Sequence, residues 1–327
     1  MRNIVTWKAS LQERHPEQPD LVDLQMTIIE DFQTFLSANG GRTVEEAIGF
    51  DANTYAVVLR QTEQDVGDTL YYLFRYAKYL GNEDLASELV LFFDAWNVMT
   101  RMSDLTKEHH AAAWENVFGD VDLPQVGATL DEMSIFTREV DRRMQAELAL
   151  ADYQYIMCKN AHAWDPAWDG DWQEQFRASG SLDAFITLLN ESFISELVSC
   201  RDKGELFWSQ IVDDQVMAHM KANPLYTRLG HTIRVQKIPY LTRRYLAAED
   251  TRMKRFYACH CPWIRNSILQ EEGAVSRHFC NCSLGHAKRP FDVAFGRAVT
   301  GRVIETVMDE DGLVCLFEID IPTEHYM

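Results

Sequence analysis

The chain has 327 residues, 46% of them apolar, and carries eight Trp, twelve Tyr and seventeen Phe side chains. This length and this supply of large side chains are enough for a sizeable core, which excludes a disordered chain. The formal net charge of −19 disfavours binding to nucleic acid and to anionic membrane surfaces.

No targeting segment is evident in the sequence. The first eight residues contain no apolar run followed by a small-residue cleavage site, so we expect no secretory signal. No stretch approaches the ~20 consecutive apolar residues that a membrane span needs. We therefore expect a soluble, cytoplasmic protein.

Residues 18–150 show the apolar spacing of helices. The pattern predicts helices over 65–80, 83–102 and 129–150, with a break at Gly81 and Asn82. Residues 160–172, which include His162 and Asp165, interrupt the pattern and are predicted to form a loop that joins two domains.

The period of the pattern changes in the last third of the chain. A helix is predicted from Leu182 to Cys200, with Gly204 as its stop signal. Residues 231–238, 301–308 and 313–321 alternate as strands do, and the last two runs form a predicted hairpin across residues 309–312. If Gly312 takes the left-handed conformation, Glu305 and Cys315 share one face of that hairpin. The expected fold is α+β, with a helical domain over 1–180 and a cysteine-rich ligand-binding domain with an antiparallel sheet over 181–327.

Positive charge is concentrated in one window. Residues 221–302 contain fifteen Lys or Arg and five Asp or Glu, a local balance of +10 that leaves −29 for the remainder. The window is consistent with a site for a small anionic ligand, or with intramolecular pairing between basic and acidic faces.

Seven cysteines lie at positions 158, 200, 259, 261, 280, 282 and 315. An odd number in a chain without an export signal favours free thiols over a disulfide framework. Two Cys-x-Cys pairs stand out, Cys259 with Cys261 and Cys280 with Cys282. On strands, residues i and i+2 point to one side, so the pairs could bring four sulfurs together as a tetrahedral zinc site. A reactive thiol and plain buried cysteines are the alternatives.

Several stretches resemble a family of cysteine-rich bacterial proteins. They are Lys-Ile-Pro-Tyr (237–240), Cys-His-Cys-Pro (259–262), Cys-Asn-Cys-Ser-Leu-Gly (280–285) and the closing hairpin with Cys315. That family is similar in turn to the 4-vinyl reductase domain, a small-molecule-binding fold, and more distantly to L-2-amino-thiazoline-4-carboxylic acid hydrolases. The resemblance implies a 4-vinyl reductase-like domain at the C-terminal end of the chain.

The resemblance also implies zinc ligands. In related phenol-sensing regulators, zinc is held by a Cys, a Glu, a second Cys and a last Cys in the hairpin. Three of these positions fall on Cys282, Glu305 and Cys315 of this chain. The remaining one falls on Met308, a poor zinc ligand, and Cys259, Cys261 or Cys280 would have to complete the set. The alternative role expected for Glu305 is a salt bridge to a nearby Arg.

Residues beside the cysteines supply the other candidates. Arg265 and Lys288 could clamp a ligand carboxylate or could be solvated surface residues. His260 and His278 are candidate general acid–base groups or ligands. His286 replaces the aromatic residue usual in the related domain, and Trp263 fits either the wall of a ligand site or the core.

These features suggest a zinc-dependent hydrolase or lyase that acts on a small anionic compound. The alternative is a non-catalytic small-molecule-binding protein with a structural zinc. The expected partners are a small-molecule ligand and a second copy of the chain in a homodimer, with neither nucleic acid nor membrane.

Overall fold

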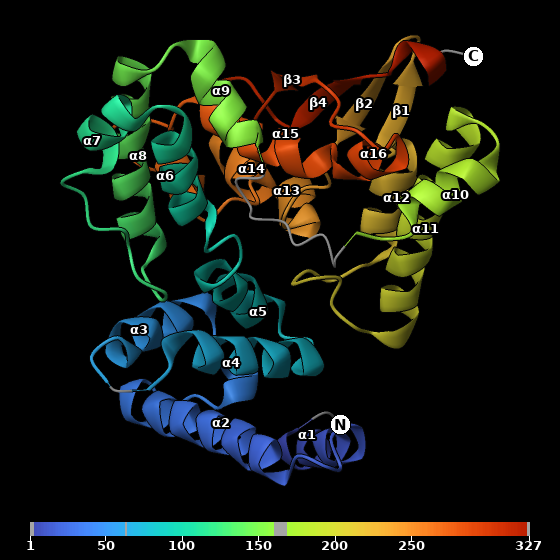
Figure 1. Cartoon of the computed structure of the whole chain (residues 1–327). Coiled ribbons are helices and arrows are strands. Elements are labelled where there is room, and N and C mark those ends of the chain that lie inside the picture. Colours follow the sequence, from blue (N-terminus) through green and yellow to red (C-terminus); the bar gives the residue numbers. More distant parts are fainter. Residues whose placement is uncertain (1–2, 63, 160–168, 326–327) are drawn as a thin grey trace. The chain divides into compact units, whose positions relative to one another are not determined.

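The computed structural model describes residues 3–62, 64–159 and 169–325, and the chain divides into two compact units (Figure 1). Unit 1 comprises Met1–Asp94, Gln125–Thr129 and Val198–Asp213, and unit 2 comprises Ala95–Pro124, Leu130–Leu197 and Asp214–Met327. The boundary expected at residue 180 lies inside unit 2, because helices that precede it pack on segments that follow it. The predicted loop with His162 and Asp165 lies mostly outside the described residues.

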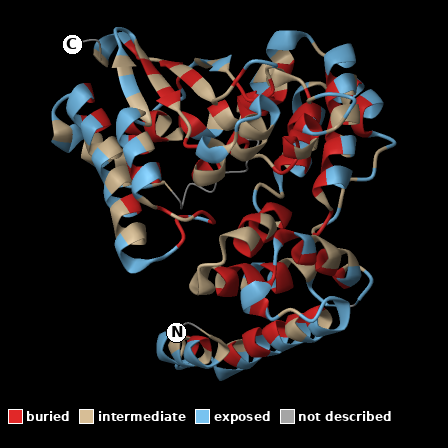
Figure 2. Ribbon diagram, turned by 180° about the vertical axis from the view of Figure 1, so that it is seen from behind, coloured by how far each residue is buried: buried red, intermediate tan, exposed pale blue. Residues whose placement is uncertain are grey.

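Unit 1 is built from helices. They are α1 (Ile4–Arg14), α2 (Pro19–Asn39), η1 (Val44–Glu46), α3 (Gly49–Leu59), α4 (Val66–Leu80), α5 (Glu83–Leu89) and η2 (Val90–Phe92). Local signals set the ends of α4: the Asp65 side chain accepts the backbone N–H of Asp68, and Gly81 ends the helix with a φ of 75°. Figure 2 shows how buried and exposed residues alternate along these helices.

The prediction of one continuous helix over residues 83–102 is wrong. It is divided into α5, η2 and a separate helix, α6 (Val98–His109). Between them Ala95 has a φ of 52°, in the left-handed region. The apolar spacing runs through the break because the residues on both sides are buried, so the pattern alone hides the change of direction.

Unit 2 contains further helices before and between its strands. They are α6, α7 (Ala111–Phe118), α8 (Leu130–Glu147), α9 (Leu150–Cys158), α10 (Trp172–Ser179), α11 (Leu182–Lys203, whose last residues belong to unit 1), α12 (Asp214–Ala222), α13 (Thr242–Ala247), α14 (Thr251–Ala258), α15 (Asn281–Ala287) and α16 (Arg289–Ala294), with short 3-10 turns η4 (Arg265–Ile268), η5 (Arg277–Cys280) and η6 (Thr323–His325). The predicted helices over 129–150 and 182–200 are confirmed as α8 and α11, and Gly204 follows α11 with a φ of 61°. In the ranges that the structure describes, no helix is both long and apolar enough to cross a membrane.

The sheet of unit 2 is antiparallel and four-stranded. Its strands are β1 (Tyr226–Leu229), β2 (Thr232–Gln236), β3 (Gly301–Glu305) and β4 (Leu316–Asp320), in the order β1-β2-β4-β3. The mixed α+β class and the origin of the sheet in residues after 205 are therefore confirmed. Strand alternation sends Ile233, Val235, Phe317 and Ile319 to one buried face, where they form a core with residues of α11, α15 and α16.

The other face of the sheet is polar. Arg234 and Arg302 both form ion pairs with Glu318 of β4, and Arg302 also pairs with Asp320. Cross-strand partners place these residues side by side, since Arg234 and Arg302 both lie opposite Glu318 in the register. This part of the basic window is thus paired within the protein.

The hairpin is confirmed, but its loop differs from the expected one. The strands end at Glu305 and begin again at Leu316, with a register shift between Val303 and Glu305. Gly312 is not in the left-handed region. Its role is close approach: a Cβ there would lie 1.9 Å from the Thr306 carbonyl oxygen. Glu305 therefore lies opposite Leu316, not Cys315.

Candidate functional site

The first Cys-x-Cys pair lies at the end of a helix, so the predicted strand is wrong. Cys259 is the C-terminal cap of α14, and Cys261 follows in a turn whose carbonyl accepts the N–H groups of Ile264 and Arg265. The Cys259 thiol points toward the Cys261 carbonyl at a sulfur–oxygen distance of 4.0 Å. Cys259 has extended backbone torsions, φ −73° and ψ 123°, but the segment pairs with no strand among the described residues.

The second pair, unlike the first, lies on helical backbone. Cys280 ends η5 and Cys282 lies in the first turn of α15. In helical backbone, residues i and i+2 point about 200° apart, so these two side chains face different surroundings. The apolar and polar residues around both pairs alternate over too few positions for the sequence to separate a strand from a short helix.

Glu305 has backbone partners. Its Oε1 accepts the N–H groups of Leu313, at 2.9 Å, and Val314, at 3.3 Å. These hydrogen bonds stabilise the loop that leads into β4. The half-buried carboxylate thus has partners other than a metal ion or the expected Arg.

Burial is the largest cause of the pKa shift at every cysteine of this region, and it raises the pKa each time. The pKa of Cys259 rises to about 12 through burial and then through Cys315. The pKa of Cys280 is raised well above its ordinary value by burial, then by Cys315 and Cys259. The pKa of Cys261 is also raised well above its ordinary value, by burial and then by Cys259 and Cys282. The thiols are therefore close to one another, and they are neutral at neutral pH.

Cys282 has different neighbours from Cys259 and Cys280. Burial raises its pKa to about 12, Lys237 lowers it, and Cys158 raises it further. Cys315 is not among the groups that shift it. Lys237 lowers the pKa of Cys315 as well, so the two positions that the family resemblance joins as zinc ligands share this cation.

The candidate zinc ligands are not gathered into one cluster among the described residues. Within residues 3–62, 64–159 and 169–325, no three His, Cys, Asp or Glu side chains are placed to hold one metal ion. Of the set that the resemblance implies, Glu305 accepts backbone N–H groups and Cys282 faces Lys237 and Cys158.

Lys237 is the cationic centre of the region, and it was not among the residues expected from the sequence. It directly follows β2, is half-buried, and its backbone N–H donates to the Cys315 carbonyl at 3.0 Å. Its positive charge lowers the pKa of six surrounding groups, in each case after the effect of burial: Cys259, Cys261, Cys282, Cys315, His260 and His286. Among the described residues, no carboxylate forms an ion pair with its ammonium group.

Most other cations of the basic window have partners. Arg228, Arg277, Lys288, Arg289 and Arg297 form ion pairs with carboxylates, in addition to the two arginines on the outer face of the sheet. Arg252 and Arg255 donate to backbone carbonyls. Intramolecular pairing thus accounts for much of the window, and Lys237 stands apart from it.

Arg265 is the second cation near the thiols. Its side chain is buried at 1% exposure, and its Nε donates to the Phe256 carbonyl at 3.0 Å. The guanidinium carbon lies 4.1 Å from the ring centroid of Phe256 and 4.7 Å from that of Tyr240. Nη1 is buried with no hydrogen-bond partner among the described residues. The surface position considered from the sequence is therefore wrong: Arg265 is a buried cation that cation–π contacts stabilise.

His260 is held in one tautomer. Its Nε2 lies 2.6 Å from the Ile238 carbonyl oxygen, and since a carbonyl only accepts, Nε2 carries the hydrogen. Burial, followed by Lys237, places the pKa of His260 well below its ordinary value. The ring is therefore neutral near pH 7, and its Nδ1 is an acceptor. The Tyr240 ring packs edge-on against it at 5.4 Å.

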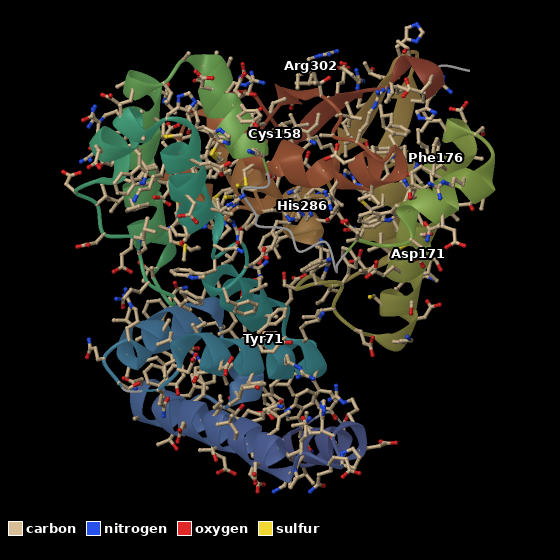
Figure 3. All side chains as sticks on the ribbon, in the orientation of Figure 1. Tyr71, Cys158, Asp171, Phe176, His286 and Arg302 are labelled. Carbon is tan, nitrogen blue, oxygen red and sulfur yellow. The ribbon has the colours of Figure 1, made fainter. Side chains whose placement is uncertain are left out.

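His286 and His278 have different environments. His286, on α15, is exposed, yet desolvation and then Lys237 lower its pKa to about 4 (Figure 3). Solvent and ligands can thus reach its imidazole although protein surrounds much of it. His278 is half-buried, with its ring 6.4 Å from that of Tyr153 on α9.

Lys288 and Trp263 are engaged elsewhere. Lys288 is buried and forms an ion pair with Asp292 one turn later in the chain. Trp263 is 1% exposed, its Nε1 donates to the Ala95 carbonyl, and Trp96 and Phe136 pack near it. Its role is in the core, so of the two alternatives for Trp263 the structure supports this one.

One signal for Lys237 was present in the sequence. The stretch 237–240 belongs to the motifs that carry the family resemblance, yet it was assigned no role. The structure places three of its residues at the site: Lys237 supplies the charge, the Ile238 carbonyl orients His260, and Tyr240 contacts both Arg265 and His260.

No family description, curated protein or solved structure matches the chain. The function must therefore be argued from the site itself.

Proposed function

We propose that unit 2 binds a small organic anion at a site centred on Lys237, with His260 and His286 beside it. The observation that carries the proposal is the half-buried Lys237 ammonium group, which has no carboxylate partner among the described residues. A cation in such a position is costly unless an anion accompanies it. The surrounding thiols and imidazoles are neutral near pH 7 and do not balance its charge.

Arg265 supports the same class of ligand. Its buried guanidinium adds a second positive charge close to Cys259 and His260, since it lowers the pKa of both after burial and the other causes. The aromatic contacts of Arg265 hold that charge in place. A carboxylate or phosphate group bound beside Lys237 would relieve the unfavourable potential of both cations.

His260 gives the site the means for proton transfer. Its hydrogen bond to Ile238 fixes the ring and leaves Nδ1 as an acceptor, while the lowered pKa makes the imidazole a weak base near pH 7 that readily gives up a proton once it has accepted one. This arrangement favours an enzyme that acts on its bound anion, of hydrolase or lyase type, over a purely passive binding domain. The zinc-dependent form of that enzyme and its 4-vinyl reductase-like fold stay predictions of the sequence, and the metal content of the purified protein measures the first.

The test is the effect of anions on thermal unfolding. Phosphate, acetate, benzoate and succinate are added separately at constant ionic strength, and Tm is measured for the full chain. At 100 times its Kd, a ligand stabilises the native state by about 2.7 kcal/mol. We expect at least one of these anions to raise the Tm of the unmodified protein.

The matched variants are Lys237→Met and Lys221→Met. Lys221 is exposed on α12, so its variant removes an equal charge away from the site. The increase in Tm should persist in Lys221→Met and vanish in Lys237→Met. An equal increase in both variants, or no increase with any of the four anions, would contradict the proposal.

A further inference from the structure

A second pair of thiols lies where α9 meets α15, and it includes the cysteine that no sequence motif singled out. Cys158 ends α9, and α9 packs against α15. Figure 3 labels Cys158 at this junction. Cys158 is half-buried, while Cys282 on α15 is buried.

Gly285 makes the close approach of the two helices possible. A Cβ at this position would lie 2.4 Å from the carbonyl oxygen of Cys158 and 3.3 Å from its Cα. Cys282 precedes Gly285 by three residues on the same helix, and such residues share a face. The side chain of Cys282 is thus directed to the surface of α15 that Cys158 covers.

We propose that Cys158 and Cys282 form a redox-sensitive dithiol that closes to a disulfide between α9 and α15. A disulfide joins Cα atoms about 4.4–6.8 Å apart, a separation that this packing allows. The inference is independent of anion binding, because it rests on the junction of the two helices and not on the unpaired charge of Lys237.

The electrostatics of the two thiols agree with this geometry. Cys158 raises the pKa of Cys282, which places the two groups near each other. Each thiol also has an ammonium group close by: after burial, Lys288 lowers the pKa of Cys158 and Lys237 lowers that of Cys282. Burial outweighs both cations, so the pKa of each thiol stays raised, and oxidation should be fastest at alkaline pH, where the reactive thiolate forms.

With a peroxide as oxidant the reaction balances in two steps. The sulfur of Cys158, the more accessible of the two, attacks one peroxide oxygen, so that hydrogen peroxide yields a sulfenic acid on Cys158 and one water. The sulfur of Cys282 then displaces the hydroxyl group of the sulfenic acid, which forms the S–S bond and releases a second water. A thiol reductant reverses the reaction by exchange.

The experiment uses the full-length chain under native conditions. The protein is treated with hydrogen peroxide, remaining thiols are blocked with N-ethylmaleimide, and cross-linked peptides are identified by mass spectrometry after digestion. We expect a Cys158–Cys282 peptide as the main disulfide, together with a higher Tm that dithiothreitol reverses.

Two single variants and one control sharpen the result. Cys158→Ser and Cys282→Ser should each lose the cross-link, whereas Cys200→Ser, on α11, should retain it. Because Cys282 is buried and its variant can lose stability, Cys158→Ser carries the comparison. A main disulfide between other cysteines, or no disulfide in the unmodified protein, overturns the proposal.

Discussion

Unit 1 and unit 2 deal with buried polar groups in different ways. In unit 1 the buried carboxylate of Asp51 pairs with Arg42 and accepts the N–H of Ile48, and the buried polar atoms without a hydrogen-bond partner within the described ranges belong to Trp7, to the neutral amide of Gln25 and to the half-buried Arg60. In unit 2 the charged side chain of Arg265 is itself buried, at 1% exposure, and its Nη1 has no hydrogen-bond partner among the described residues. Six of the seven cysteines also belong to unit 2.

The difference indicates which unit contains buried groups that lower the stability of the folded state. A neutral buried amide without a partner costs far less than a buried charge without one. Unit 1 therefore has the character of a packed helical scaffold, whereas unit 2 retains an electrostatic imbalance that a ligand can relieve. Four predictions test this contrast, in order of decreasing effect.

The largest effect is expected at the core of unit 2. Trp263→Ala should lower the free energy of unfolding by about 3–5 kcal/mol, because a buried indole ring and its hydrogen bond to Ala95 are lost. Trp208→Ala, at a residue that is 63% exposed, serves as the control and should change it little. Chemical denaturation measures both. If Trp263→Ala lowered the free energy of unfolding only slightly, Trp263 would line a ligand site instead of the core.

The junction of α9 and α15 should tolerate no side chain at position 285. Gly285→Ala is expected to destabilise the protein by about 1–3 kcal/mol, since its Cβ would collide with the Cys158 backbone. Gly40→Ala in unit 1 is the matched control, because the nearest atom to its Cβ lies 4.0 Å away and its φ of 169° suits any residue. Equal stability of the two variants in urea would show that the helices separate easily.

The third prediction concerns pH. The unfolded His260 imidazole binds a proton below about pH 6.5, but the folded one does so only at lower pH, so the unfolded state holds more protons in that window. Stability should therefore fall as pH decreases below 6.5, by up to about 1.4 kcal/mol per pH unit from this residue.

His260→Gln removes the titration and keeps an amide that can donate to the Ile238 carbonyl. Its free energy of unfolding, measured in urea at several pH values, should fall less steeply than that of the unmodified protein. His231→Gln, at an exposed position, is the control. The argument fails if the free energy of unfolding depends on pH with the same slope in both variants.

The smallest effect on stability is expected at Arg265 itself. Arg265→Met should change the free energy of unfolding by less than about 1 kcal/mol, because the loss of cation–π contacts is offset by removal of a buried unpaired charge. The same variant should reduce any increase in Tm that an anion produces. A loss of several kcal/mol would mean that Arg265 has a stabilising partner and that its charge is balanced within the protein.

The sequence by itself determined the elements whose signals are local. The 3.6-residue period and the stop at Gly81 define α4, the alternation over 231–238 defines β2, and the two alternating runs near the end define the hairpin. It also placed Arg265, His260 and His286 near one another as candidates, because they lie close to the two Cys-x-Cys pairs.

Only the tertiary structure decided what those residues do. Whether a cation is paired depends on carboxylates far away in the sequence: Glu318 neutralises Arg234 and Arg302 across the sheet, while Lys237, one residue beyond the same strand, has no described ion pair. Glu305 accepts N–H groups from a loop whose course no local pattern specifies. Cys280 and Cys282 lie on helical backbone, and Cys259 and Cys261 follow the end of α14, because packing overrides weak propensity in short segments. Periodicity is local and therefore readable from the sequence, whereas the compensation of charge is a property of the folded chain.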